Sequence, residues 1–133
     1  MENQTKDQYL KQNWEAVAAS YCQDQEVIDA IFGDIYHRYS ESHRAYHNHQ
    51  HIVELLQLIE DHTDSAHRNI HVMAAFFHDI VYVPGNNDNE WQSSLLATEL
   101  MTKIGVSAAE IEAVSQIILA TQNHEWFDAS IPN

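Results

Sequence analysis

The spacing of apolar residues constrains the fold of this chain more than any other feature. In residues 9–22 the apolar side chains recur every three or four positions, which is the period of a helix that buries one face. Similar stretches follow along the 133 residues. Only three glycines and two prolines interrupt them, and no stretch shows the β-branched alternation of a strand. The sequence therefore predicts an all-α fold, a compact bundle of about six helices.

Capping and turn signals place the ends of these helices. The predicted helices cover about residues 9–22, 25–39, 48–61, 66–81, 90–104 and 108–123. Asp24 and Asn89 are predicted N-caps, Ser107 begins a capping box, and Gly105 is predicted to stop the fifth helix. The fourth helix is almost wholly apolar from residue 72 on, so we expect it at the centre. With no linker or repeat, residues 1–133 are predicted to form a single domain.

The charge balance restricts the partners of this chain. Aspartate and glutamate number 20 against 6 lysines and arginines, for a net charge of −14. Such a surface repels nucleic-acid polymers and anionic membranes, although a bound cation reverses the sign locally. Cys22 is the single cysteine, and the chain shows neither a secretory signal nor an apolar run of membrane-spanning length. We therefore expect a cytoplasmic protein with no membrane partner.

A histidine–aspartate pair is the strongest functional signal. His78 and Asp79 directly follow the apolar run 72–77. Burying an imidazole and a carboxylate is costly unless something compensates them, and a divalent cation would compensate both. Adjacent residues on a helix point about 100° apart, so both reach one ion only at a crevice or a helix end. The alternative is structural, with Asp79 capping a turn and His78 satisfied in the core.

Further candidate residues have weaker signals. His47 and His51 lie four positions apart, so on a helix they share one face. They could bind one metal together, or one could bind the metal while the other transfers protons. The alternative is a solvent-exposed, polar start of a helix. His124 is a candidate metal ligand, a phosphate-binding group or an ordinary C-terminal histidine. Glu90 is a candidate for orienting a water or contacting a second metal, although first-turn glutamates are common. The other histidines are expected at the surface: His37, His43, His49, His62, His67 and His71.

Together these residues resemble the HD-domain superfamily of metal-dependent phosphohydrolases. The similarity rests on Tyr46-His47-Asn48-x-x-His51, on the segment 74–80 that contains the His78-Asp79 pair, and on Thr121-x-x-His124. It spans roughly residues 40–124. The first motif and the Pro-Gly-x-Asn that follows the pair also look like those of the cyclic-nucleotide phosphodiesterases. The whole chain looks most like the small bacterial predicted HD phosphohydrolases, in which Asn89-Glu90 followed by Ser93 or Ser94 is also familiar.

The resemblance implies roles for these residues. His51, His78 and Asp79 would be metal ligands, His124 a further metal-site residue, and His47 a general acid or phosphate-binding group. Mixed imidazole and carboxylate ligands suit Mn²⁺, Fe²⁺, Co²⁺, Ni²⁺ or Zn²⁺ better than Mg²⁺. The implied activity is hydrolysis of a nucleotide or another small phosphorylated metabolite by a metal-activated water.

The sequence departs from the family pattern at one point. The family ends with a further aspartate ligand on a later helix, whereas here Asp128 is the only aspartate of the tail. Three explanations stay open: a truncated chain, a naturally short protein, or a site completed by another chain, as in a homodimer. An alternative function follows, a catalytically impaired module that binds metal or nucleotide and works by association. A di-iron oxygenase ranks last, because the Glu-x-x-His pairs of such bundles are missing from the sequence.

Overall fold

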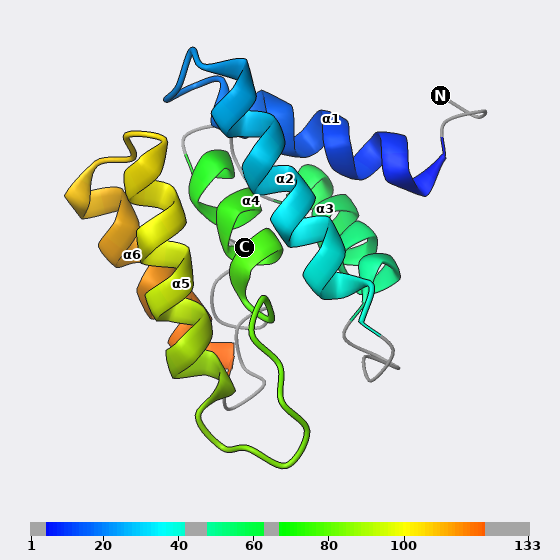
Figure 1. Ribbon diagram of the computed structural model, residues 1–133, viewed down its shortest axis with the longest axis vertical. Coiled ribbons are helices and arrows are strands. Elements are labelled where there is room, and N and C mark those ends of the chain that lie inside the picture. The colour runs from blue at the N-terminus through cyan, green and yellow to red at the C-terminus, as the bar shows by residue number, and fades with distance from the viewer. Residues whose placement is uncertain (1–4, 42–47, 63–66, 122–133) are drawn as a thin grey trace.

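The computed structural model describes residues 5–41, 48–62 and 67–121, which form an all-α bundle (Figure 1). Within these ranges there are six helices and no strand. The helices are α1 (Lys6–Ala18), α2 (Gln25–Tyr39), α3 (His49–His62), α4 (Arg68–Phe77), α5 (Asn89–Lys103) and α6 (Ala108–Ala120). The predicted fold class is therefore confirmed.

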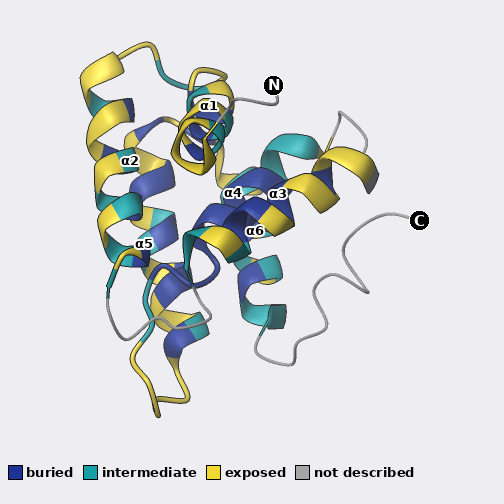
Figure 2. Cartoon of the chain, turned by 90° about the vertical axis from the view of Figure 1, so that its right-hand side faces the viewer, coloured by how far each residue is buried: buried dark blue, intermediate teal, exposed yellow. Residues whose placement is uncertain are grey.

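Helix α4 occupies the centre of the bundle, as the sequence predicts. Every residue from His71 to Phe77 is buried, and α4 packs against α1, α3, α5 and α6 (Figure 2). Figure 1 shows α5 and α6 paired on one side of α4, with α1, α2 and α3 on the other. An almost continuous apolar sequence suits this position because residues 71–77 of α4 have no solvent-facing side to cover with polar residues.

Local capping signals account for several helix ends. Asp24 accepts a hydrogen bond from the amide of Glu26 (3.1 Å) at the start of α2, and Ser107 caps α6 as predicted. Gly105 ends α5 with a φ of +84°, and its amide donates to the carbonyl of Thr102 (3.1 Å). This left-handed conformation is unfavourable for residues with a Cβ, so glycine is the natural stop.

The predicted limits of the first helix were wrong at both ends. Helix α1 begins at Lys6 because Thr5 and Gln8 form a reciprocal capping box, a local signal that the spacing of apolar residues does not contain. It ends at Ala18, whose carbonyl accepts the amides of both Tyr21 and Cys22 in a terminal turn. At the other end of the chain α6 stops at Ala120, and residues 122–133 lie outside the described ranges.

The predicted fourth helix was also too long, since α4 ends at Phe77 rather than near residue 81. The amide of Asp79 donates to the hydroxyl of Tyr39 (3.1 Å) and not to a helical carbonyl. Two residues later the amide of Val81 donates to Ser93 Oγ (3.0 Å), and the same hydroxyl donates to the carbonyl of Val81 (3.1 Å). The hydroxyls of Tyr39 on α2 and Ser93 on α5 therefore form hydrogen bonds with backbone groups that would bond within the helix if α4 continued.

Asn89 is not the N-cap of α5, which corrects a second prediction. Asp88 occupies that position without a side-chain capping bond, and Asn89 is the first helical residue. The amide side chain of Asn89 accepts from the backbone amide of Val83 (3.0 Å) and donates to its carbonyl (3.1 Å). Asn89 therefore fastens the loop that follows the His78-Asp79 pair to the start of α5.

The helices of the described residues are too short and too polar to cross a lipid bilayer. The longest contain 15 residues, whereas a span needs about 20 predominantly apolar ones.

We expect alkaline pH to weaken the packing of α1 on α3. Burial, reinforced by the neighbouring Glu60 carboxylate, raises the pKa of the Tyr9 phenol to about 12 from its usual 10. The Tyr9 hydroxyl donates to Glu60 Oε1 (3.1 Å), so the folded state favours the neutral phenol. The unfolded chain loses this proton near pH 10, so the contribution of Tyr9 to stability is intact below pH 10 and falls between pH 10 and 12.

Urea unfolding of the wild type and Tyr9→Phe between pH 8 and 12 measures this contribution. The wild type should lose more stability than the variant above pH 10, because phenylalanine has no proton to lose. Parallel pH profiles of the two proteins would show that the contact with Glu60 contributes nothing.

Candidate metal centre

His51 enters the site from the start of α3. It is the third residue of that helix, and the side chain of Asn48 accepts hydrogen bonds from the amides of Gln50 (3.1 Å) and His51 (3.4 Å). Asn48 therefore acts as the N-cap of α3 and satisfies two amides that have no partner within the helix. This cap sets where the first turn begins and, with it, the direction in which the His51 side chain leaves the helix.

His78 comes from the end of α4, where it is the C-cap residue. Its side chain is buried, and its Nδ1 lies 2.9 Å from the carbonyl oxygen of Ala75. A carbonyl oxygen only accepts, so Nδ1 carries a proton and Nε2 is the ring nitrogen that faces the site. The same second hydrogen bond orients metal-binding histidines in general and selects the tautomer that ligates through Nε2.

Asp79 lies just past the end of α4 and is 8% exposed. Its Oδ2 lies 3.2 Å from Nε2 of His78. Two ligand atoms bound side by side to one transition metal, each at about 2.1 Å, lie about 3.0–3.4 Å apart. The separation of this nitrogen and this oxygen is therefore that of neighbouring ligands on one ion.

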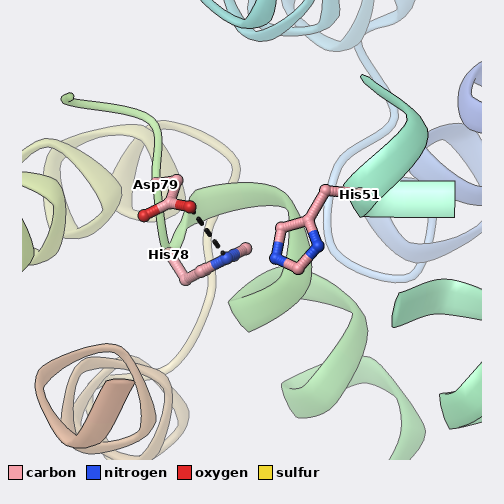
Figure 3. A group of neighbouring side chains, drawn as sticks. All are labelled: His51, His78 and Asp79. Carbon is pink, nitrogen blue, oxygen red and sulfur yellow. Dashed lines mark ion pairs between the residues drawn. The ribbon is translucent and has the colours of Figure 1, made fainter. Parts of the chain in front are cut away.

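The three side chains converge although His51 is 27 positions before His78 (Figure 3). One ligand atom from each of His51, His78 and Asp79 lies within 4.8 Å of the others. The two imidazole rings stand edge to face with centroids 5.4 Å apart. Ligands on opposite sides of an ion are separated by about 4.2 Å, so small side-chain shifts bring all three onto one cation. Within the described ranges no other group of histidine, cysteine and acidic side chains meets this criterion.

The chemistry of the donor set fits a divalent transition metal. When His78 is neutral, the Nε2 lone pair and the Asp79 carboxylate face each other at 3.2 Å, which is repulsive unless a positive charge lies between them. A cation satisfies both atoms and His51 as well. Two nitrogen ligands and one oxygen ligand favour Mn²⁺, Fe²⁺, Co²⁺, Ni²⁺ or Zn²⁺ over Mg²⁺. The alternative, a protonated His78 paired with Asp79, satisfies the pair but leaves the approach of His51 unexplained.

The other candidate residues are not part of this group. His47 and His124 lie outside the described residues, so their predicted roles stay predictions. Glu90 lies half-buried in the first turn of α5 and contributes no atom to the group. Its predicted role at a water or a second metal also stays a prediction.

Two histidines expected at the surface are not there. His49 is half-buried, with its ring stacked on Tyr36 (centroids 4.2 Å apart, 19° between planes) and its Nε2 2.9 Å from the carbonyl of Tyr36. His71 is 5% exposed, and its Nδ1 lies 3.0 Å from the carbonyl of His67. Its position on the helix places His49 on a different side of α3 from His51, but helix α2 covers the side on which His49 lies. For His71 the surrounding apolar run is the signal that indicates burial.

Comparison with models of known protein families, with curated proteins and with solved structures found no match for this chain. The resemblance to the HD-domain superfamily therefore stays a prediction from the motifs.

Proposed function

We propose that this protein is a metal-dependent phosphohydrolase that acts on a nucleotide or another small phosphorylated metabolite. The observation that carries the proposal is the convergence of two imidazoles and one carboxylate, from His51, His78 and Asp79, at the ends of two helices. The order of the three motifs along the chain, which resembles that of the HD-domain superfamily, supports it independently.

The side chains of the group would hold the ion and keep it oriented. His51 and His78 would provide imidazole nitrogens, Asp79 would provide the carboxylate oxygen, and the carbonyl of Ala75 would keep the proton of His78 on Nδ1. When bound, the ion supplies the positive charge that lowers the pKa of a water and stabilises charge on phosphoryl oxygens. His47 is proposed to protonate the leaving oxygen, a role suited to a group that titrates near neutrality.

The charge of the chain supports a small substrate rather than a polymer. With a net charge of −14, the protein repels the many phosphates of a nucleic acid, whereas one or two phosphates need only a local cation. We propose that it works in the cytoplasm, where a chain with a single cysteine is stable in its reduced form. A homodimer that completes the site is one of the explanations the sequence leaves open, and it stays a prediction.

Metal replacement tests this function on the wild-type protein. The protein is stripped of metal with a chelator and supplied with Mn²⁺, Co²⁺, Ni²⁺, Zn²⁺ or Mg²⁺. Phosphate release is then measured on a panel of nucleotides, an aryl phosphate and a single-stranded oligonucleotide. We expect release from small substrates only with a transition metal, weaker release with Mg²⁺, and none from the oligonucleotide.

The same experiment separates the enzyme from the alternative module. If the protein binds about one ion per chain but releases phosphate from no substrate, the result favours a binding module that works by association. Equal phosphate release with and without metal would contradict the proposed mechanism.

A further inference from the structure

The hydroxyl of Tyr39 joins the last turn of α2 to the end of α4. Tyr39 is the last residue of α2, and its side chain is 1% exposed. The hydroxyl donates to the carbonyl of Phe76 (2.9 Å) and accepts from the amide of Asp79 (3.1 Å). One buried oxygen thus holds the backbone on both sides of Phe77 and His78.

These two bonds replace bonds of a regular helix. In a continued helix the amide of Asp79 would donate to the carbonyl of Ala75, four residues earlier. That carbonyl instead lies 2.9 Å from Nδ1 of His78, because the amide of Asp79 is taken up by Tyr39. The carbonyl of Phe76 is likewise occupied by Tyr39, and the amide of Ile80 donates to Phe77 (3.2 Å) in a tighter turn.

The bonds to Tyr39 leave the Ala75 carbonyl to the His78 imidazole and anchor the backbone of Asp79. His78 keeps a helical backbone (φ −63°, ψ −29°), so the departure from the helix begins at Asp79. A helix that continued through Asp79 would point the amide of Asp79 at the carbonyl of Ala75, where it would compete with the imidazole for that acceptor. Tyr39 therefore anchors the backbone from which the Asp79 carboxylate reaches Nε2 of His78, 3.2 Å away.

The same turn of α2 also contacts the start of α3. The carbonyl of Tyr36 lies 2.9 Å from Nε2 of His49, and the two rings stack. Ser40 Oγ lies 3.4 Å from the same nitrogen. Helix α2 gives no atom to the group of metal-ligating side chains, yet its last turn touches both of the segments that do.

We propose that Tyr39 is a positioning residue for the metal site, which sets the geometry of His78 and Asp79 by ending α4 at Phe77. The inference rests on the proposed function, since it requires that these two residues bind a metal. The contact between Tyr36 and His49 performs the corresponding task for His51.

Tyr39→Phe is the direct test, because it keeps the buried ring and removes only the hydroxyl. We expect the Kd for Mn²⁺ or Co²⁺ to rise about 10- to 100-fold, the usual effect of losing a hydrogen-bond partner that orients a ligand. We also expect the visible spectrum of the Co²⁺-loaded protein to change. In the metal-free variant, NMR should show that the Nδ1 proton of His78 has lost its hydrogen bond to Ala75.

Two matched controls separate positioning from a general loss of stability. Tyr9→Phe removes a hydroxyl that bonds Glu60 between α1 and α3 and should leave the Kd unchanged. Ile28→Val loosens the core at the other end of α2, about 16 Å along the helix from Tyr39, and should lower the Tm without changing the Kd. If Tyr39→Phe does not fold, His49→Phe replaces it, since this variant keeps the stacked ring and loses the bond to Tyr36.

The outcomes distinguish the two proposals. If the wild type and Tyr39→Phe bind metal with the same Kd, the positioning role is overturned and the proposed function stands. An equal loss of affinity in Ile28→Val would also overturn it, because stability alone would then explain the effect. Wild-type protein that binds none of the ions would overturn the proposed function and the positioning role with it.

Discussion

Asp79→Asn is expected to weaken metal binding at least about a hundredfold and to abolish metal-dependent phosphate release. The amide has nearly the shape of the carboxylate and leaves the backbone bond to Tyr39 intact, but it lacks the negative charge that attracts a cation. The effect should exceed the 10- to 100-fold typical for residues that only orient a ligand, because a ligand itself is lost.

Thermal unfolding with and without Mn²⁺ measures this loss independently of catalysis. An ion at about a hundred times its Kd stabilises the folded state by about 2.7 kcal/mol, so the wild type should show a clear rise in Tm. Asp79→Asn at the same concentration should show almost none. The double variant His78→Ala with Asp79→Ala should behave in the same way.

Asp61→Asn is the matched control for charge. Asp61 is exposed near the C-terminal end of α3, and its replacement changes the net charge by the same amount as Asp79→Asn. It should retain the metal-induced rise in Tm and the activity of the wild type. Metal binding and activity that survive in Asp79→Asn would remove the carboxylate from the proposed site and, with it, the main support for a metal centre.

Trp14→Ala is expected to lower the free energy of unfolding by about 3–5 kcal/mol, a large share of the about 5–15 kcal/mol typical of a domain. Trp14 is 0% exposed and lies edge to face with Phe76 and Phe77 of α4, at centroid distances of 5.7 Å for both. Its indole nitrogen donates to the carbonyl of Ile28 (3.0 Å). The truncation therefore opens a cavity between α1 and α4 and removes the hydrogen-bond donor of a buried carbonyl.

Trp91→Ala is the control, because Trp91 is 54% exposed on α5. An exposed side chain of this kind usually changes stability by no more than about 0.5 kcal/mol. Urea unfolding followed by circular dichroism compares the two variants. Similar losses in both would mean that the core between α1 and α4 is not where the stability of the bundle resides.

The sequence predicts the helices well because their signals are local. The spacing that buries one side of each helix, the cap at Asp24 and the stop at Gly105 all act within a few residues of the helix they define. Where the prediction followed the spacing of apolar residues alone, the helix ends were wrong. Helix α1 begins three residues early because the box formed by Thr5 and Gln8 precedes its first apolar residue.

The candidate site was predictable in part. The apolar run before His78 and Asp79 indicates that the pair is buried at a helix end, and the resemblance adds His51. The resemblance draws attention to Asn89 and Ser93 but not to their role in fastening the following loop, since they bond backbone groups 6 and 12 residues earlier, beyond the span of a helical turn. The predicted roles of His47 and His124 concern residues outside the described ranges and stay predictions.

By itself, then, the sequence determined an all-α chain with a central apolar helix that ends near a histidine and an aspartate, because such features depend on neighbours three or four residues away. Only the tertiary structure decided that α4 stops at Phe77, that His49 stacks on Tyr36, and that His51 reaches the His78-Asp79 pair. The physical reason is that these outcomes depend on hydrogen bonds and packing between helices. The bond from the amide of Asp79 to Tyr39 spans 40 positions, and no local pattern encodes it.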